Sequence, residues 1–342
     1  LPRTYAFVAH AAIFWAVAAQ RRTPWLRYSG WALLAGSLVL GIALLLGTNF
    51  GSAKLPFIDR EIYSLLPGGW RPFWNPLGFN SNLTGGLLVL FLPPATALMW
   101  GGSSWQQRDV AKPVTIVLAL IILLSQSRGA LMGGGVALLG MSLLHDRRWG
   151  ILWGLVGLGV AAAVYRYGFN PLLESLLGRS DLFGDKSLTG RQQLWQQAVF
   201  IINQFPLTGV GFGMFEPTVR QLQSAPEMLV QASREFKHAH NLYLQAGVEL
   251  GLLGLIAHLV IYLRLTYLLW QRAIDRTAGY DRILALGLLG SMFALLTHGF
   301  FEVITYGPRP AAVVWALFGL MVAVAAGPMS SNEPSQRPLP PS

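Results

Sequence analysis

Long apolar segments constrain this chain more than any other feature of its sequence. A helix needs roughly 17 to 25 mostly apolar residues to cross a bilayer, and hydropathy identifies about nine such segments here. Because lipid offers the backbone no hydrogen-bond partners, only helices or closed barrels can span it. We therefore predict an all-α fold, a polytopic transmembrane helical bundle, in which Pro93 and Pro94 kink the third span. The predicted spans cover residues 5–20, 30–48, 82–100, 112–126, 128–144, 149–166, 241–270, 283–302 and 311–327.

The composition supports a membrane protein and excludes several kinds of chemistry. Of the 342 residues, 53% are hydrophobic and 12% are charged, against roughly 25% charged in an ordinary soluble domain. The sequence has no cysteine, which excludes disulfides, thiolate nucleophiles and cysteine metal clusters. Its net charge of +10 comes largely from arginines scattered between apolar spans, so we expect membrane lipids as partners and no nucleic acid. Because the sequence opens at Leu1 without a signal-like region, we expect its natural start to be missing.

Positive charges in the short loops orient the predicted spans. If about nine spans alternate, all the short loops rich in arginine and lysine fall on one face, which is then cytoplasmic. The opposite, outer face receives Arg128, His240 and the long segment between the sixth and seventh spans. The charged loop residues are Arg21, Arg22, Arg27, Arg108, Lys112, Arg147, Arg148, Arg272, Arg276 and Arg282.

The topology divides the chain into four parts. Residues 1–166 form six spans, residues 167–240 form the outer segment, residues 241–327 form three spans, and the proline- and serine-rich residues 328–342 form a disordered cytoplasmic tail. Within the outer segment, residues 190–204 have an apolar face opposite a row of glutamines, so we predict an amphipathic helix that lies on the membrane. Its apolar residues are Leu194, Trp195, Ala198, Val199, Ile201 and Ile202.

The start of this amphipathic helix carries a cation. Thr189 is expected to cap the helix, which places Arg191 in the first turn. The helix dipole disfavours a positive charge there unless an anion lies nearby. We therefore expect an anionic ligand or an acidic neighbour at Arg191. Pro206 and the glycine-rich residues 209–213 are expected to end the helix in a tight turn.

His240 stands where the polar outer segment meets the seventh span. An imidazole held by a rigid helix and facing an aqueous site has the placement that general-base chemistry needs. Gly247, Gly251 and Gly254 follow at helical spacings, and we expect them to let another helix backbone approach closely.

Arg128 lies at the outer end of two predicted spans, where a guanidinium against lipid is costly and usually faces a polar cavity. Snorkelling to the membrane surface is the simpler alternative. If Arg128 and Arg191 face one cavity, their paired N–H donors suit the oxygens of a diphosphate. The sequence does not show whether the two side chains converge.

Other ionisable residues receive weaker predictions. His238 and His240 form an HxH pair that could ligate a metal, but no carboxylate or cysteine nearby in the sequence completes a ligand set, so we predict no metal site. Glu249 falls on the opposite helix face from His240, and we expect a buried polar link to another helix. His298 and Glu302 are four residues apart and are expected to contact each other, in either a functional or a structural pair.

Three stretches together resemble the O-antigen ligase and O-antigen polymerase superfamily of integral membrane proteins. They are SQSRGALMGGG at 125–135, TGRQQLWQQAVFIINQFPLTGVGFGMF at 189–215 and HAHNLYLQAGVELGLLG at 238–254. The third fits the family pattern at His240, Asn241, Gly251 and Gly254.

This resemblance implies a metal-independent, inverting glycosyltransferase of the bacterial inner membrane, working at the periplasmic face without a cofactor. The implied donor is a glycan on undecaprenyl diphosphate, and the acceptor is a hydroxyl of a glycolipid, as in lipopolysaccharide biosynthesis, or of another glycan. Arg128 and Arg191 would bind the diphosphate, and His240 would deprotonate the acceptor. We assign supporting roles to His238, Asn241, Glu249, His298 and Glu302.

Two other functions stay open from the sequence. A glycan polymerase of the same superfamily would use the same chemistry with a second lipid-linked glycan as acceptor. Relatives regarded as small-anion, inorganic-carbon transporters share the motifs, but a transporter should have broken helices and polar groups through the full bilayer depth. The polar residues here gather at the outer end of the spans.

Overall fold

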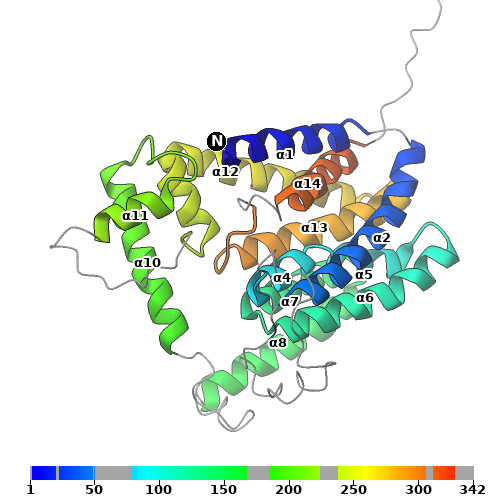
Figure 1. Ribbon diagram of the computed structural model, residues 1–342. Coiled ribbons are helices and arrows are strands. Elements are labelled where there is room, and N and C mark those ends of the chain that lie inside the picture. The colour runs from blue at the N-terminus through cyan, green and yellow to red at the C-terminus, as the bar shows by residue number, and fades with distance from the viewer. Residues whose placement is uncertain are drawn as a thin grey trace, which may run out of the picture.

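The protein folds into a bundle of helices (Figure 1). The structure, a computed structural model, describes residues 2–20, 23–48, 50, 79–167, 185–223, 238–305 and 311–327. In these ranges the one β feature is an isolated bridge between Thr48 and Phe79, which confirms the all-α prediction. The predicted tail at 328–342 and much of the outer segment lie outside the described residues.

A helix occupies each predicted span, and the third span contains two. The helices are α1 (Pro2–Ala18), α2 (Thr23–Gly47), α4 (Ser81–Leu88), α5 (Leu92–Gly101), α6 (Trp105–Ser125), α7 (Arg128–His145), α8 (Arg147–Tyr167), α12 (Leu242–Ile274), α13 (Tyr280–His298) and α14 (Ala311–Ala326). The outer segment adds α10 (Asp185–Gln204) and α11 (Phe215–Gln223), and the 3-10 turn η2 (Arg276–Ala278) joins α12 to α13.

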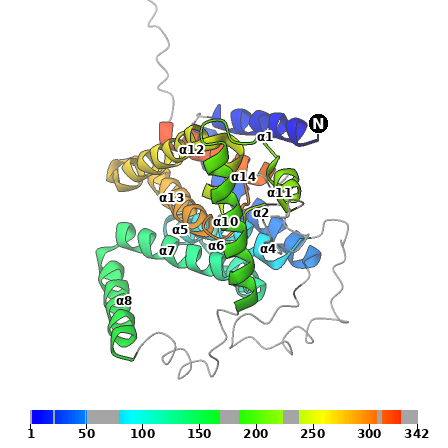
Figure 2. The ribbon, with the colours of Figure 1, turned by 90° about the vertical axis from the view of Figure 1, so that its left-hand side faces the viewer.

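The lengths and apolar character of these helices make this a multi-pass membrane protein. Among the described residues, four stretches are long and apolar enough to cross a bilayer by themselves, and α1 and α14 supply shorter apolar helices. The four are Tyr28–Gly47, Ser81–Gly101, Leu242–Ile274 and Tyr280–His298. The full count of about nine spans therefore stays a prediction. α8 packs on α7 and otherwise stands apart from the bundle (Figure 2), with exposed Trp149, Leu155 and Leu158 as expected for a lipid-facing helix.

The third predicted span is broken, not kinked. α4 ends at Leu88, and α5 begins at Leu92 with Pro93 and Pro94 in its first turn. Proline fits the start of a helix because the backbone N–H that it lacks would be unpaired there. At the break, the carbonyl of Leu90 accepts a hydrogen bond of 2.6 Å from Ser291 Oγ on α13.

α13 is the central helix of the bundle, packing against α5, α7, α12 and α14. Small residues allow this close approach. A methyl group at Gly287 would lie 2.6 Å from Pro94 Cα on α5, and one at Gly290 would collide with Met141 on α7. Glycine-mediated contact of this kind is the usual way to bring membrane helices together. The end of α13 is consequently held in a fixed position, which matters because the candidate site lies there.

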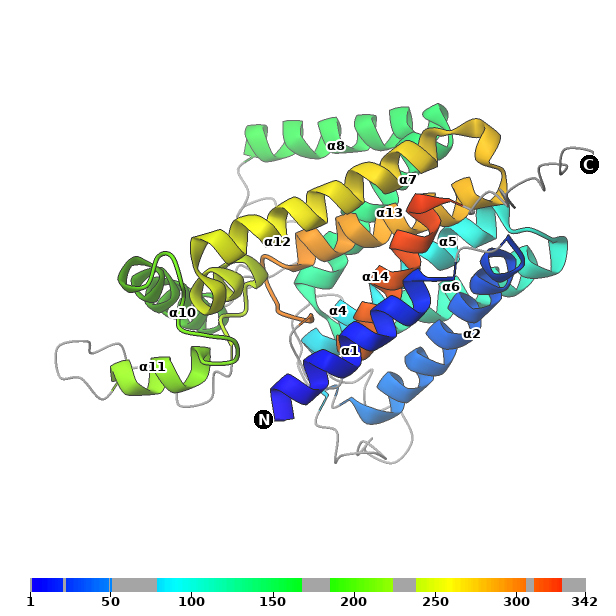
Figure 3. The same cartoon turned by 90° about the horizontal axis from the view of Figure 1, so that it is seen from above.

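The amphipathic helix differs from its prediction in start and surroundings. α10 begins at Asp185, so Thr189 lies inside the helix and does not cap it. Part of its apolar face is buried by protein, whereas Val199 is 47% exposed. Leu194, Ala198 and Ile201 are 0–1% exposed and pack with α11, Ala239 and the first turns of α12. Figure 3 shows α10 and α11 together at the end of the bundle where α12 begins. The helix is therefore amphipathic because it covers this end of the protein.

α12 bends at Gly251, and the predicted glycine turn holds the bend. Gly251 has φ 70° and ψ −177°, well outside helical values, which glycine adopts without a steric cost. The N–H of Leu252 donates to Pro206 O (2.7 Å), and the carbonyls of Val248 and Glu249 accept from Val210 and Gly211 (2.9 and 3.0 Å).

The three glycines of α12 were predicted to let another helix backbone approach closely. The structure gives each of them a different neighbour. Gly251 lies against the loop backbone at Leu207 and Gly209, and Gly247 lies against the Ile202 side chain of α10. Gly254 faces the side chain of Leu250 in its own helix.

Candidate active site at the junction of α12 and α13

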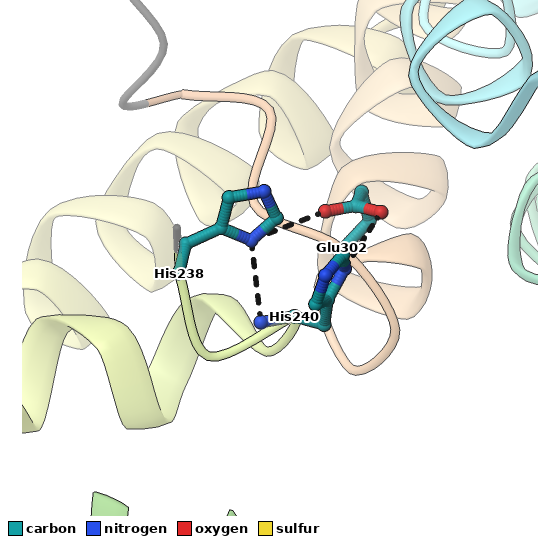
Figure 4. A group of neighbouring side chains, drawn as sticks. All are labelled: His238, His240 and Glu302. Atoms are coloured by element: carbon teal, nitrogen blue, oxygen red, sulfur yellow. Dashed lines mark hydrogen bonds and ion pairs between the residues drawn. The ribbon is translucent and has the colours of Figure 1, made fainter. Parts of the chain in front are cut away.

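Hydrogen bonds fix the backbone that carries the two histidines before α12. The N–H of Ala239 donates to Gln245 Oε1 at 2.8 Å, and its carbonyl accepts from Trp195 Nε1 at 3.1 Å. The Ala239 side chain is buried in the cluster formed with α10 and α11. His238 and His240 flank this anchored residue, and both rings lie beside Glu302 (Figure 4). The tripeptide thus presents two imidazoles from a fixed backbone.

The start of α12 is tied to the end of α13 by three further hydrogen bonds. The N–H of Leu242 donates to Gly299 O (2.7 Å), Tyr243 Oη donates to Leu296 O (2.7 Å), and Asn241 Nδ2 donates to Phe300 O (3.3 Å). Asn241 also caps α12, because its side-chain oxygen accepts from the backbone N–H groups of Tyr243 and Leu244 at 3.0 Å each. Capping by asparagine satisfies otherwise unpaired donors of the first turn. Asn241 therefore links the helix start, the histidines and the α13 terminus.

Glu302 follows α13 and completes a polar cluster with the two histidines. Its Oε2 lies 3.1 Å from His240 Nδ1, and its Oε1 lies 3.5 Å from His238 Nδ1. The Glu302 side chain is only 4% exposed, whereas those of His238 and His240 are 32% and 18% exposed. Burial by itself raises the pKa of Glu302. The hydrogen bond from His240, the charges of His240 and His238 and the Val303 N–H outweigh burial and lower the pKa to about 2. Glu302 is therefore an anion at neutral pH.

Backbone strain marks the same end of the bundle. In the described part of the chain, two residues other than glycine have positive φ angles, Gln126 at 48° and His240 at 47°. Such left-handed conformations cost energy in residues with a Cβ atom, and strained residues gather at functional sites. Gln126 is buried and ends α6 two residues before Arg128. One strained residue is thus the predicted base His240, and the other lies two residues before Arg128.

The structure brings Arg128 and Arg191 together at this end of the bundle. The two guanidinium groups are close enough for the charge of Arg191 to act on Arg128. Burial lowers the pKa of Arg191, and the carboxylate of Glu302 raises it. Because α10 starts at Asp185, Arg191 lies in the second turn of the helix and not in the first. The helix dipole is weaker there, so it is not the reason to expect an anion beside Arg191. Glu302 is the acidic neighbour that the sequence analysis expected.

His298 is fully buried among small residues. Methyl groups added at Gly86 or Gly129 would meet its imidazole, so the two glycines make room for the ring. The N–H of Glu302 donates to His298 O at 3.1 Å, and the charge of Glu302 acts on the ring. His298 and Glu302 thus interact as predicted, by a backbone hydrogen bond and by the charge of the carboxylate. The Glu302 side chain itself is hydrogen-bonded to His240.

Glu249 lies one turn beyond Gln245 and is buried. Its Oε1 accepts a 2.8 Å hydrogen bond from Gln245 Nε2, and Gln245 in turn accepts from the Ala239 N–H. This hydrogen bond runs along the helix of Glu249 toward the histidines. The link from Glu249 to another helix stays a prediction. Gln245 was missed in the sequence analysis. It could have been found from the sequence, because Gln245 is a polar residue near the start of an apolar span.

The cluster has the parts of a general-base site beside an anion site. When a carboxylate accepts the proton of His240 Nδ1, the lone pair of the neutral ring lies on Nε2. The carboxylate also stabilises the imidazolium that forms when Nε2 takes up a proton. Arg191 supplies positive charge in electrostatic reach of Glu302, and Arg128 lies in reach of Arg191. The same cluster also brings three side chains that can ligate a metal together, His238, His240 and Glu302, which was not expected from the sequence.

Comparisons with known proteins identify the same region. Residues 113–259 match a family model described as O-antigen ligase. This range contains Arg128, Arg191 and His240. The chain is also 35% identical over 104 residues to the exopolysaccharide production protein ExoQ of Rhizobium meliloti (strain 1021). That alignment covers 29% of this chain and 22% of ExoQ. The matches confirm the resemblance to this family, and Glu302 lies beyond the matched range.

Proposed function

We propose that this protein is a glycosyltransferase of the O-antigen ligase type that acts at the periplasmic face of the bacterial inner membrane. Its donor is a glycan on undecaprenyl diphosphate, and its acceptor is a hydroxyl of a glycolipid or glycan. The observation that carries the proposal is the 3.1 Å contact between His240 and Glu302. Arg191 lies in electrostatic reach of Glu302, and Arg128 lies in reach of Arg191. The family match over residues 113–259 supports the same chemistry.

His240 is the proposed general base. With its Nδ1 proton donated to Glu302 Oε2, Nε2 accepts the proton of the acceptor hydroxyl as the oxygen attacks the anomeric carbon of the donor. The bond between that carbon and the diphosphate oxygen breaks, and its electron pair leaves with the diphosphate. A single displacement of this kind inverts the anomeric configuration. His240 needs no metal for this step, because Glu302 provides the negative charge that stabilises the imidazolium.

Arg128 and Arg191 are proposed to bind the diphosphate. Negative charge grows on the leaving group as the glycosidic bond breaks, and fixed cations placed there stabilise the transition state more than the ground state. A guanidinium presents paired donors that match phosphate oxygens. The mutual repulsion of two nearby arginines also falls when a diphosphate lies between them. The pair is therefore suited to holding the donor and assisting its departure.

Replacement of His240 tests this function. The full chain, purified in detergent, is supplied with a polyprenyl-diphosphate-linked glycan and candidate acceptors, and product is followed by mass. We expect His240→Ala to lower transfer by roughly 10² to 10⁴-fold, the contribution typical of a positioned general base. His258→Ala, which changes a histidine elsewhere on α12, is the matched control, and thermal unfolding checks that both variants fold. Undiminished transfer by a folded His240→Ala protein would refute the proposal.

A glycan polymerase is the second candidate function. The name of the matched relative, an exopolysaccharide production protein, favours it, and the same residues would serve it, with a second lipid-linked glycan as acceptor. Incubation with a single repeat-unit donor separates the two functions. A ladder of products of increasing length identifies a polymerase, and one addition to a foreign acceptor identifies a ligase.

Small-anion transport is the third function to test. The break between α4 and α5 and the bend of α12 at Gly251 are features that transporters also use. The candidate catalytic residues His240 and Glu302, however, lie together where α12 begins and α13 ends. Liposomes that contain the purified protein alone and take up bicarbonate or another small anion, with no glycan transfer, would establish transport in place of transfer.

A further inference from the structure

Three side chains at the candidate active site are spaced like the ligands of a tetrahedral metal ion. One ligand atom each from His238, His240 and Glu302 lies within 4.8 Å of the other two. The distances from Glu302 oxygens to the nitrogens of His240 and His238 are 3.1 and 3.5 Å. Zinc bonds of roughly 2.0–2.1 Å in tetrahedral geometry separate neighbouring ligands by about 3.3 Å. Small side-chain movements therefore suffice to place one ion among the three.

His238 Nδ1 faces the buried carboxylate of Glu302 and lies 3.5 Å from its Oε1. It also lies 3.3 Å from the backbone nitrogen of His240. A cation bound here would take the Nδ1 lone pair in place of this long backbone contact, and it would also pair with the Glu302 carboxylate.

We propose that His238 Nδ1, His240 Nδ1 and the Glu302 carboxylate bind a divalent cation of the Zn²⁺ class, and that this cation switches off the transferase. The inhibitory part rests on the proposed function, and the binding part does not. Two imidazoles and one carboxylate suit Zn²⁺ and its neighbours far better than Mg²⁺ or Ca²⁺, which prefer oxygen ligands. Solvent reaches the two half-buried histidines, so a water molecule can complete the coordination.

Inhibition follows from the two nitrogens of the imidazole ring. When Glu302 accepts the Nδ1 proton of His240, Nε2 keeps the lone pair that removes the acceptor proton. When the cation takes the Nδ1 lone pair, the single proton of the neutral ring resides on Nε2. Nε2 then has no lone pair for catalysis. The ring gains and loses no proton overall, because the proton moves from Nδ1 to Nε2 through solvent.

The surrounding structure supports reversible binding. Ala239 is anchored on both sides by Gln245 and Trp195, so little ordering is needed to hold both histidines in place. The positive charge of Arg191, which lies in electrostatic reach of Glu302, opposes a second cation and weakens the site. A preformed but electrostatically weakened site is suited to regulation, since the ion can leave when its free concentration falls.

Direct binding measurements test the site without donor or acceptor. The full chain, purified without a histidine tag, is titrated with Zn²⁺ against a chromogenic chelator, with Mg²⁺ as the comparison ion. We expect one Zn²⁺ per chain in the wild type, and at least about tenfold weaker binding in His238→Ala and in Glu302→Gln. His258→Ala is the matched control and should bind as the wild type does. Absence of stoichiometric binding, or equal weakening in all variants, would overturn the site.

Transfer assays test the regulatory consequence separately. In the wild type, Zn²⁺ should reduce glycan transfer, and a chelator should restore it. In His238→Ala, the Zn²⁺ concentration needed for half inhibition should rise at least about tenfold. Zn²⁺ binding without inhibition would overturn the regulatory role, and loss of transfer on chelation would replace inhibition with a catalytic metal. If His240→Ala stays active while Zn²⁺ binds as expected, the proposed base fails and the binding site stands.

Discussion

His240 and Glu302 are 62 residues apart in the sequence, yet His240 Nδ1 lies 3.1 Å from Glu302 Oε2. The contact exists because the first turn of α12 is hydrogen-bonded to the last turn of α13 at Leu296, Gly299 and Phe300. The Glu302 carboxylate is nearly inaccessible to water, while the imidazole keeps a partly exposed edge. A buried anion behind a half-buried imidazole is an arrangement that orients and stabilises a general base.

Glu302→Gln should impair catalysis without unfolding the protein. The amide keeps the shape of the carboxylate and its capacity to accept the His240 proton, but it no longer stabilises the imidazolium. We expect kcat to fall at least about tenfold. Steady-state kinetics measure this loss.

Asp281→Asn is the matched control for this change. Asp281 also accepts a hydrogen bond from a cationic side chain, Arg272, at 2.9 Å, but this pair joins the end of α12 to the start of α13, away from the candidate site. It should leave kcat unchanged. A lower Tm for Glu302→Gln with no change in kcat would assign Glu302 a structural role alone.

Arg128→Lys and Arg191→Lys should each weaken use of the donor. Lysine retains the positive charge but not the paired, planar donors that match a diphosphate. A charge-assisted hydrogen bond contributes about 1.5–3 kcal/mol, so each variant should lose roughly 10- to 100-fold in kcat/KM for the donor. Initial rates at varied donor concentration give this value. The acceptor KM should change little.

The double variant tests whether the two arginines act on one group. Because their charges interact in the structure, we expect non-additive losses in a double-mutant cycle. Arg220→Lys is the control, since Arg220 forms an exposed pair with Glu216 on α11. Strictly additive losses would indicate that Arg128 and Arg191 contact separate ligands.

Gly251→Ala should destabilise the protein. Gly251 has φ 70°, and a methyl group there would collide with the carbonyl oxygen of Leu207. The strain alone is worth about 1–3 kcal/mol, so Tm in detergent should fall. Gly135→Ala on α7 is the matched control, because a methyl group there meets no atom within 4 Å and alanine favours the helix by about 0.5–1 kcal/mol. Equal Tm values for the two variants would contradict the proposed role of the bend.

Asn241→Ala should loosen the junction between α12 and α13. It removes the cap of α12 and the bond to Phe300, and loss of an asparagine cap costs about 1 kcal/mol. Asn241→Asp keeps the cap but not the Nδ2 donor. We therefore expect Tm to fall for the alanine variant and transfer to fall for both variants. Preserved transfer in Asn241→Asp would mean that the Phe300 bond does not position His240.

Local sequence patterns predicted the helices because they depend on short-range properties. Apolar runs of spanning length occur as helices in each expected range, and Pro93 and Pro94 were correctly associated with an interruption. The start of α10 was predicted at residue 190 but is found at Asp185, so the capping preference of Thr189 did not decide where the helix begins. Part of its apolar face packs on protein, and the membrane contact expected for this face stays a prediction. An amphipathic pattern predicts a buried face but not the partner that buries it.

The sequence by itself determined the helical elements and nominated Arg128, Arg191 and His240 as the chemical groups. Only the tertiary structure decided that Glu302 pairs with His240, that His238 joins them, and that the two arginines lie close together. Glu302 had been assigned to His298, its neighbour one helical turn away, because helical periodicity relates only residues three or four apart. The pairing with His240 depends instead on hydrogen bonds between two helix ends and on the close packing that fixes α13. Such contacts come from the simultaneous packing of the whole bundle, which no local stretch of sequence encodes.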